Sequence, residues 1–315
     1  MSQVIGGRSL RRWIGARVNA TVHGGDLQLQ RYREPPGDPG LFGPDTVVWR
    51  VHCDIPGMFT GGLAALLLQS LHPLAIAGVD QHSDFRRNPI DRLNRTAGFV
   101  SVTSYGSTEA AEAALSRVRR VHEYVRGTAP DGRPYSAADP ELLTWVHVAE
   151  TSCFLAGYQV FGRGRLTAAE QDRYFAEVAV VAERLGATDV PASAAEVRGY
   201  FAAVRGELAA TEAALAAVEF LRGFGPTPGQ RAAVRVLMNG AVSLLPPWAA
   251  QTLRVRRPRP VQELVDRPAV HALGAVMRYG CEPSAILGAA RARVAAPRAE
   301  PGLAPAGNPV PMNGS

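Results

Sequence analysis

From about residue 45 onward, apolar residues recur with the period of an α-helix almost without interruption. Helix-start signals accompany this pattern. Asp139-Pro140-Glu141 combines an N-cap residue, a proline at the first helical position and an early acidic residue, and it predicts a helix over Leu142–Gly157. Thr167-Ala-Ala-Glu170 and Ser193-Ala-Ala-Glu196 have the spacing of capping boxes. Strand patterns are scarce, with one brief alternation over Thr46–His52, so the predicted fold class is all-α.

Composition divides the chain into three segments. Residues 1–44 are rich in glycine and proline and are predicted to be an irregular N-terminal segment. Residues 45–295 are predicted to form a single large helical domain, because a hydrophobic content of 46% is ample for a core. Residues 296–315 are rich in proline and poor in apolar side chains, which predicts a disordered tail.

The chain contains no lysine, so all 34 of its basic residues are arginines. Schiff-base chemistry, a lysine general base and lysine ligation of a metal are therefore excluded. The cluster Arg254-Val-Arg256-Arg257-Pro-Arg259 could meet phosphate or an acidic surface, but most such runs are solvated faces. No recognition-helix motif is evident, and we expect no nucleic-acid partner.

Cysteine use and hydropathy bear on the compartment. The three cysteines include no Cys-x-x-Cys pair, which argues against a disulfide framework or a zinc finger and fits a reducing cytoplasm. The longest apolar stretch, Leu63 to Val79, is interrupted by polar residues and by Pro73. It predicts a buried helix pair and no membrane span.

One predicted helix, Ser107–Gly127, carries a histidine on its apolar face. Leu115, Val118 and His122 are spaced i, i+3 and i+7, so the imidazole points toward the core. A core histidine that is hydrogen-bonded to a backbone carbonyl explains this spacing, and so does an axial metal ligand. Arg119 lies on the same face, and arginines there would suit anionic groups.

Two further segments could line a site. Arg92, Arg95 and Thr96 are spaced i, i+3 and i+4, so a helix places them on one side, where they would hold carboxylates or form an ordinary surface. The small residues of Gly61-Gly62-Leu-Ala64-Ala65 would admit a neighbouring helix or a flat ligand.

Other catalytic templates fit poorly. A carboxylate-bridged di-iron bundle requires two Glu-x-x-His repeats, and the chain offers only the reversed His147-Val-Ala-Glu150. His82-Ser-Asp84 has the spacing of a facial triad, but this region is predicted to be helix or loop. The chain has neither a dinucleotide-binding glycine motif after a strand nor a hydrolase nucleophile elbow.

Several motifs occur in series along the chain. They are Leu66-Leu-Leu-Gln69-Ser-Leu-His72-Pro73, Gly78-Val79, Arg92-Leu-Asn-Arg95-Thr96, Val121-His122-Glu-Tyr-Val125-Arg126-Gly127, Tyr135-Ser-Ala-Ala-Asp139-Pro140-Glu141, Trp145-Val-His147, Asp172-Arg-Tyr-Phe-Ala-Glu177 and Arg278-Tyr-Gly280. In this series the chain resembles the MpaB-type oxygenase family, which includes the latex-clearing rubber oxygenases. The resemblance covers roughly residues 45–290.

The resemblance implies a globin-like helical core that binds one b-type haem and performs oxidative chemistry with dioxygen. By analogy with the rubber-oxygenase branch, His122 matches the proximal haem ligand and thus the metal site. Arg119 and Arg126 match its flanking, cofactor-binding arginines. Arg92 and Thr96 match the arginine and threonine beside the distal pocket. A neutral imidazole that holds iron and arginines that neutralise propionates are chemically consistent with these roles.

Position 95 departs from the rubber-oxygenase pattern, which has a lysine immediately before that threonine. Arg95 cannot deprotonate to bind iron. We therefore expect no rubber cleavage, and we expect a five-coordinate or water-bound iron with Arg95 donating a hydrogen bond to bound oxygen. The residues assigned to catalysis are Arg92, Arg95 and Thr96.

The predicted function is a cytoplasmic, haem b-dependent oxygenase that uses O2 on a small apolar substrate of isoprenoid or unsaturated type. The alternative is a non-catalytic haem-binding or haem-sensing helical protein. Substrate-dependent O2 consumption separates these two hypotheses.

Overall fold

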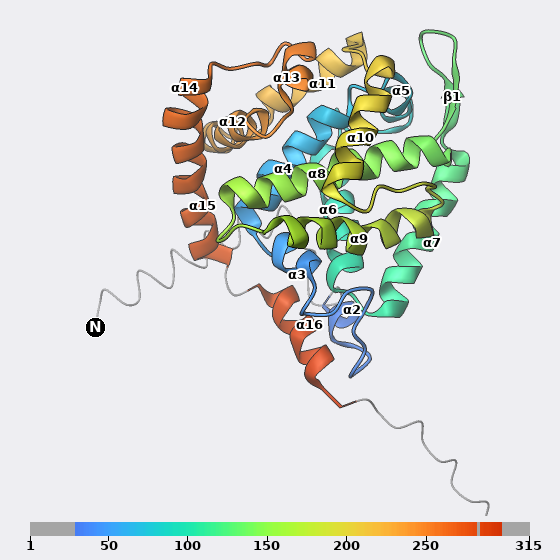
Figure 1. Cartoon of the computed structure of the whole chain (residues 1–315), viewed down its shortest axis with the longest axis vertical. Helices are drawn as coiled ribbons and strands as arrows, with labels where there is room; N and C mark the ends of the chain where they lie inside the picture. Colours follow the sequence, from blue (N-terminus) through green and yellow to red (C-terminus); the bar gives the residue numbers. More distant parts are fainter. Residues whose placement is uncertain (1–28, 282–283, 298–315) are drawn as a thin grey trace, which may run out of the picture.

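The structure is a computed structural model that describes residues 29–281 and 284–297, and nearly all regular structure in this part is helical (Figure 1). The elements in chain order are α2 (Gln30–Arg33), α3 (Val47–His52), α4 (Ile55–Gln69), α5 (Pro73–His82), α6 (Pro89–Tyr105), α7 (Thr108–Tyr124), β1 (Arg126–Thr128), β2 (Pro134–Ser136), α8 (Pro140–Phe161), α9 (Ala168–Leu185), α10 (Ala194–Val204), η2 (Arg205–Glu207), α11 (Glu212–Gly223), α12 (Pro228–Val242), α13 (Pro247–Thr252), α14 (Arg259–Val261), the π-helical turn η3 (Gln262–Asp266), α15 (Arg267–Cys281) and α16 (Ala285–Ala295).

The helix starts that were predicted from capping residues are confirmed. The Asp139 carboxylate accepts hydrogen bonds from the backbone of Glu141 and Leu142, and α8 begins at Pro140 and extends beyond the predicted end to Phe161. Thr167 and Glu170 form a complete capping box at the start of α9. At α10 only the Ser193 half of the box forms, because the Glu196 carboxylate accepts from Ala192 N instead.

The most extensive helix–helix contact joins α4 and α8, which run side by side through the middle of the molecule (Figure 1). Glycines allow their backbones to touch. A Cβ on Gly61 would lie 2.6 Å from the Cys153 carbonyl oxygen, and a Cβ on Gly157 would collide with the Gly57 carbonyl oxygen. The small residues of α4 therefore admit a neighbouring helix, as one of the two sequence interpretations predicted.

Two apolar cores flank this helix pair, and α8 contributes to both. The first core joins α8 to α3, α9 and α16, with Trp49, Phe154 and Tyr174 among its buried side chains. The second joins α8 to α4, α11, α12 and α13, with Trp145 at its centre. α8 therefore has a burial partner on nearly every side, and its position is tightly determined.

The predicted buried helix pair is present as α4 and α5. A bend of 105° separates the two helices at the break before Pro73, and most of α4 is buried. Within the described residues, no single helix has both the length and the apolar character of a membrane span, and only this bent pair meets the two criteria jointly.

The strand-like alternation over Thr46–His52 was misleading, because this segment forms the helix α3. The Thr46 hydroxyl caps the helix by accepting from Trp49 N. Val47, Val48, Trp49 and Val51 are all buried, and Arg50 is the single exposed residue of this six-residue helix, so the segment is too short and too buried to reveal its helical period.

The predicted end of the helix containing His122 was also wrong. α7 ends at Tyr124 and not at Gly127, because Val125 is extended and its carbonyl oxygen accepts a hydrogen bond of 2.8 Å from Ala137 N. The chain then forms a two-stranded antiparallel hairpin in which Arg126 pairs with Ser136. This hairpin adds short strands to the predicted all-α fold.

The predicted segment boundaries fall partly outside the described residues. Residues 1–28 and the tail from 298 onward are among those not described, so the disorder predicted for the tail stays a prediction. Residues 29–44 of the N-terminal segment are irregular except for α2. No disulfide joins Cys53, Cys153 and Cys281.

A buried arginine ties the C-terminal helix to the N-terminal segment. Arg293 on α16 is 2% exposed, and its guanidinium donates hydrogen bonds of 2.9 to 3.0 Å to the carbonyl oxygens of Asp38, Tyr32 and Tyr105. Burial lowers the pKa of this arginine. The contact joins α2, the end of α6 and α16 through one side chain.

Replacing this arginine should destabilise the fold strongly. Arg293→Met keeps an apolar stem but leaves buried carbonyl oxygens without donors, and we expect a loss of about 3 kcal/mol in the free energy of unfolding. Urea denaturation measures the change. The matched control is Arg291→Met on the same helix, where the side chain is exposed and the expected change is within about 0.5 kcal/mol. Equal midpoints for the two variants would contradict the role of Arg293.

Candidate functional site

The hairpin of α6 and α7 is buried at one end only. The buried residues of α6 are its last four, residues 102–105, and those of α7 are Ala111 and Leu115. Toward the other end the apolar side chains Leu93, Phe99 and Val118 are only half-buried. The two helices therefore pack firmly at the Gly106 turn and present incompletely covered apolar surface at the opposite end.

His122 lies at this open end, in the last turn of α7. Its side chain is half-buried, and its Nδ1 atom is enclosed by protein without a hydrogen-bond partner. Burial lowers the pKa of His122, so the ring is neutral at pH 7. A backbone acceptor, which a purely structural histidine would be expected to have, is missing. Because Nδ1 is enclosed, Nε2 is the nitrogen left to meet a ligand.

Of the three predicted residues on α6, only Arg92 is partly enclosed. Its Nη1 donates a hydrogen bond of 2.6 Å to the Ser83 hydroxyl, and burial together with nearby Arg95 lowers its pKa. Arg95 is paired with Asp91 at 3.4 Å, and both side chains are 68% exposed. Thr96 is exposed as well. The helix forms as predicted, but Arg95 and Thr96 lie on its solvent-facing part.

The two arginines predicted to flank His122 occupy different elements. Arg119 is an exposed residue of α7, and its Nη1 approaches the Arg184 carbonyl oxygen on α9 at 3.4 Å. Arg126 lies in β1, beyond the end of the helix, so helical spacing does not place it beside His122. Its position is determined by the pairing with Ser136.

The start of α8 lies near the end of α7, the helix that carries His122, because the β-hairpin brings the two chain segments together. The hydrogen bond from Ala137 N to Val125 O joins the residue after α7 to a residue just before α8. His147 and Glu150 follow within about three turns of α8, since a turn rises about 5.4 Å. Figure 1 shows the C-terminal end of α7 beside this end of α8.

His147 and Glu150 are ionisable side chains with no hydrogen-bond or ion-pair partner among the described residues. They are one turn apart on α8 and each is half-buried. Burial lowers the pKa of His147 to about 4 and raises the pKa of Glu150 to about 7. Both side chains are thus strongly desolvated although part of each remains exposed.

A third histidine, His52 at the end of α3, has partners on two helices. Its Nδ1 lies 2.7 Å from the Ser104 hydroxyl of α6, and its Nε2 lies 3.0 Å from the Tyr174 hydroxyl of α9. Burial, and to a lesser extent nearby His147, lowers the pKa of His52 to about 3. α3, α6, α8 and α9 thus contribute polar groups to one interior region.

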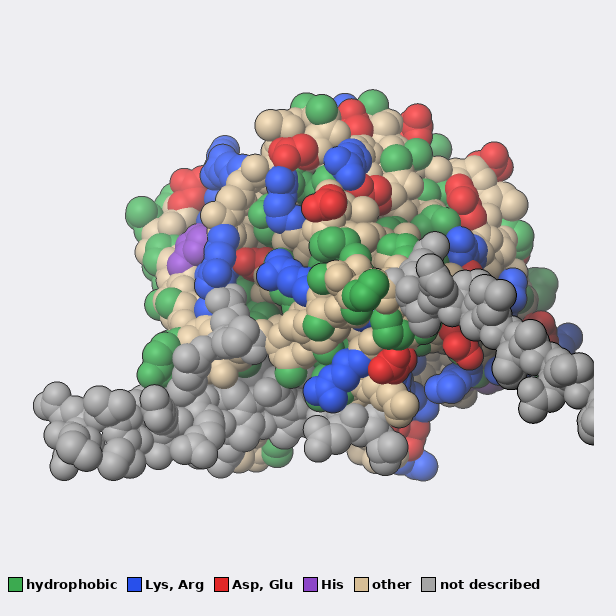
Figure 2. Space-filling view, turned by 90° about the horizontal axis from the view of Figure 1, so that it is seen from below, with side chains coloured by type: hydrophobic (Ala, Val, Ile, Leu, Met, Phe, Trp, Pro, Cys, Tyr) green, Lys and Arg blue, Asp and Glu red, His purple; other side chains and the backbone are tan. Residues whose placement is uncertain are grey.

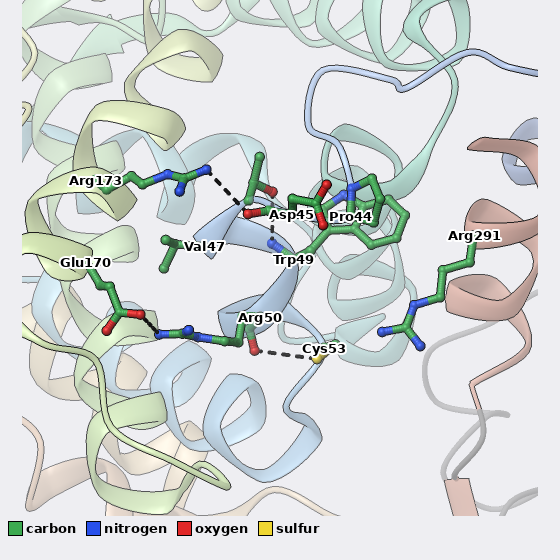
Figure 3. A pocket seen from close by; sticks show the side chains of 10 residues that line it. Pro44, Asp45, Val47, Trp49, Arg50, Cys53, Glu170, Arg173 and Arg291 are labelled. Atoms are coloured by element: carbon green, nitrogen blue, oxygen red, sulfur yellow. Dashed lines mark hydrogen bonds and ion pairs between the residues drawn. The ribbon is translucent and has the colours of Figure 1, made fainter. Parts of the chain in front are cut away.

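A separate surface cavity of about 330 Å³ lies on the far side of α3, at the start of α9 (Figure 3). Its polar lining is largely paired within the protein: Arg50 pairs with Glu170 at 2.7 Å, and Arg173 donates to the Asp45 carbonyl oxygen. None of the predicted site residues lines it. We do not assign it as the functional site.

The arginine cluster before α14 is partly neutralised. Arg257 forms a bidentate pair with buried Asp266 at 2.7 and 3.0 Å, and Arg259 pairs with Glu263 at 3.1 Å. Figure 2 shows basic side chains interspersed with acidic ones on the face it presents.

The described residues contain no group of three or more His, Cys, Asp or Glu side chains placed to hold a metal ion. The donor that the site offers is therefore a single neutral imidazole, not a protein cage of several ligands.

Comparison with protein families identifies the family to which this helical domain belongs. The family model described as "ER-bound oxygenase mpaB/B'/Rubber oxygenase, catalytic domain" matches residues 49–279. The chain belongs to this family. No curated protein and no solved structure matches the chain significantly.

The mpaB/rubber oxygenase match confirms the resemblance found in the sequence motifs, and the family is one of oxygenases. The matched range includes His122, the three predicted arginine and threonine positions on α6, and the interior groups of α3, α8 and α9.

Sequence reasoning missed most of the interior polar groups of this mpaB/rubber oxygenase domain. His52 lies in the segment mistaken for a strand, and Glu150 was considered only as part of a di-iron pattern. Tyr174 lies within a family motif but had no assigned role. The signal that could have found Glu150 is an acidic residue in the middle of a long, largely apolar helix.

The interior groups predict a specific pH dependence of stability. Neutral His147 has a folded pKa below its unfolded value, so its stabilising effect is lost as the pH falls from 6.5 toward about 4. Glu150 has a folded pKa above its unfolded value, so its effect has the opposite sign, and stability falls as the pH rises from 4.5 toward about 7.

Urea unfolding at pH 7 and pH 5 tests both signs. When the pH is lowered from 7 to 5, His147→Gln should lose less free energy of unfolding than the wild type does. Glu150→Gln should lose more over the same interval. Each difference should be about 1 kcal/mol, less than full desolvation would produce, because both side chains keep some contact with water. Identical pH dependence in all three proteins would contradict the burial of these groups.

Proposed function

We propose that this chain is a haem b-dependent oxygenase that uses O2 on a small apolar substrate of isoprenoid or other unsaturated type. The observation that carries the proposal is the neutral, half-buried imidazole of His122, with Nδ1 unpartnered, at the open end of the amphipathic α6–α7 hairpin. Membership of an oxygenase family supports the reaction class.

The residues present fit a haem group. A porphyrin already supplies four nitrogen ligands, so one axial histidine suffices, and the described residues offer no competing carboxylate or thiolate cluster. The half-buried apolar side chains Leu93, Phe99 and Val118 lack full packing partners, as a slot for a flat apolar ring would require. The proposal includes a globin-like arrangement of the surrounding helices.

Each assigned side chain would then have a physical task. His122 would hold the cofactor through Nε2. Arg92, Arg119 and Arg126 would supply positive charge for the cofactor's carboxylates. Haem, when bound, supplies one-electron and dioxygen chemistry. The apolar walls of α6 and α7 exclude water and admit an apolar substrate.

Arg95 and Thr96 remain proposed pocket residues at the rim of α6. Arg95 keeps its proton at any working pH, so it acts as a hydrogen-bond donor and cannot close the site as a ligand. To reach inward, Arg95 must break its ion pair with Asp91. This pair is exposed to solvent and is therefore weak.

The cofactor assignment predicts a visible spectrum. Protein expressed with added haem should show a Soret band, and His122→Ala should lose it or bind haem at least about tenfold more weakly, because the axial bond is gone. The matched control is His271→Ala, an exposed histidine of α15, which should leave the spectrum unchanged. If the wild type shows no Soret band, or if His122→Ala keeps the same axial ligation, the assignment fails. His147 is then the first alternative ligand.

The oxygenase assignment predicts O2 uptake that depends on an unsaturated substrate. We expect the haem-loaded protein to consume O2 with a dispersed unsaturated isoprenoid alcohol and not with its saturated analogue. An oxygen electrode measures both. A protein that binds haem but consumes no O2 with any unsaturated lipid tested would be a haem-binding or haem-sensing protein instead.

A further inference from the structure

One face of α8 carries ionisable side chains that no part of the proposed cofactor site uses. His147, Glu150 and Phe154 are spaced i, i+3 and i+7, so they share this face. The face points toward α3, because the rings of Phe154 and His52 meet edge to face at 5.5 Å. The adjoining face, with Ala149 and Cys153, packs in the core that contains α4.

Glu150 is unusual among the acidic residues near this region. Glu170 and Glu177 pair with arginines, whereas the Glu150 carboxyl makes no hydrogen bond or ion pair with any described residue. Unlike His122 Nδ1, which is fully enclosed and has no partner, the Glu150 oxygens are not fully enclosed by protein. A carboxyl that is desolvated, unpaired and still accessible can form a hydrogen bond with a ligand that reaches this interior region.

The titratable groups around Glu150 come from three helices. His147 and Cys153 lie on α8 itself, and burial keeps the first neutral and raises the pKa of the second to about 12. Tyr174 faces it from α9, with a pKa raised by burial, and His52 lies nearby on α3.

The other helices packed on α8 supply no counter-charge to Glu150. α4 has no charged residue between Ile55 and Gln69. The charged residue of α15 nearest to α8, Arg278, is engaged by Asp54 at 2.8 Å and by the Phe161 carbonyl oxygen, at the far end of α8. In α5, Asp80 is exposed and pairs with Arg86.

A hydrogen-bonded chain lies behind this carboxyl. The His52 ring joins the Ser104 and Tyr174 hydroxyls, so it accepts from one hydroxyl and donates to the other. His147 lies close enough to His52 to influence its pKa. This arrangement links α6, α3 and α9 through polar atoms that can each hold a proton.

We propose that Glu150 is an acid–base residue of the interior site: its carboxyl O–H bond breaks as its proton bonds to an oxygen atom that the reaction with O2 has placed on the substrate, and its carboxylate then takes up a proton from water. The inference rests on the proposed oxygenase function. Loss of the proton leaves the Glu150 carboxylate, and its return restores the acid, so the group is unchanged over a cycle. His52 and Tyr174 act as positioning residues behind it.

The connection between α7 and α8 relates the helix of Glu150 to the helix of His122. The Val125–Ala137 hydrogen bond fixes the end of α7 beside the start of α8. α7 packs mainly on α6 and α9, and α8 mainly on α4 and α9, so the two helices share the support of α9. The end of α7 that carries His122 is therefore held near the start of α8, the helix that carries His147 and Glu150.

The first test needs no cofactor. Infrared spectroscopy of the wild-type chain should show a protonated-carboxyl band that titrates with a midpoint of about 7. The band should vanish in Glu150→Gln and persist in the matched control Glu141→Gln, an exposed glutamate on the same helix. Thermal unfolding monitors the fold, and Glu150→Asp, which keeps a carboxyl, provides a second variant if Glu150→Gln does not fold. Absence of a band titrating near neutral pH in the wild type would overturn the proposal.

The second test uses the haem-loaded protein. Glu150→Gln should leave the Soret band and KM unchanged, lower kcat by about 100-fold or more, and abolish the pH dependence of kcat near neutrality. Glu150→Asp should keep part of the wild-type rate, because it retains a carboxyl. The control variant Glu141→Gln should have the full wild-type rate. An unchanged pH profile in Glu150→Gln overturns the proposal. A wild type without a Soret band refutes the proposed function instead, and the infrared titration of that same chain still decides whether Glu150 holds its proton.

Discussion

The close contact between α4 and α8 is the constraint on which the remaining structure depends. Glycines at the crossing let the two backbones touch, so any side chain at Gly61 or Gly157 would force the helices apart. α8 is thereby fixed with apolar cores on two sides. The direction in which His147 and Glu150 point follows from this contact, since rotation of α8 would bury them against one of the cores.

Desolvation then determines the chemistry of the interior. It favours the neutral form of every ionisable group, and so it lowers the pKa of the histidines and raises that of Glu150. The region holds many polar atoms and little formal charge at pH 7. Such an interior can accept an apolar ligand while retaining groups that bind metal or move protons, a combination that suits the family's reaction class.

Features with local causes were predictable from the sequence, and features with distant causes were not. The starts of α8 and α9 follow from capping residues within one turn. The end of α7 does not, because the extended conformation at Val125 accompanies pairing with a segment on the other side of the hairpin turn. The pKa of Glu150 likewise arises from helices that are remote in sequence. The family motifs placed His122 on its helix, but its unpartnered Nδ1 is a property of the folded chain.

The one-ended burial of the α6–α7 hairpin separates folding from ligand uptake. The packed end contains the Gly106 turn and the Tyr105 carbonyl held by Arg293, so the hairpin is anchored without any ligand. The half-covered apolar surface lies at the other end, beside His122. A ligand that enters there supplies the missing packing partner and stabilises the native state by mass action. Under the proposed function, the hairpin is thus a receptor whose packed end folds independently of its cofactor.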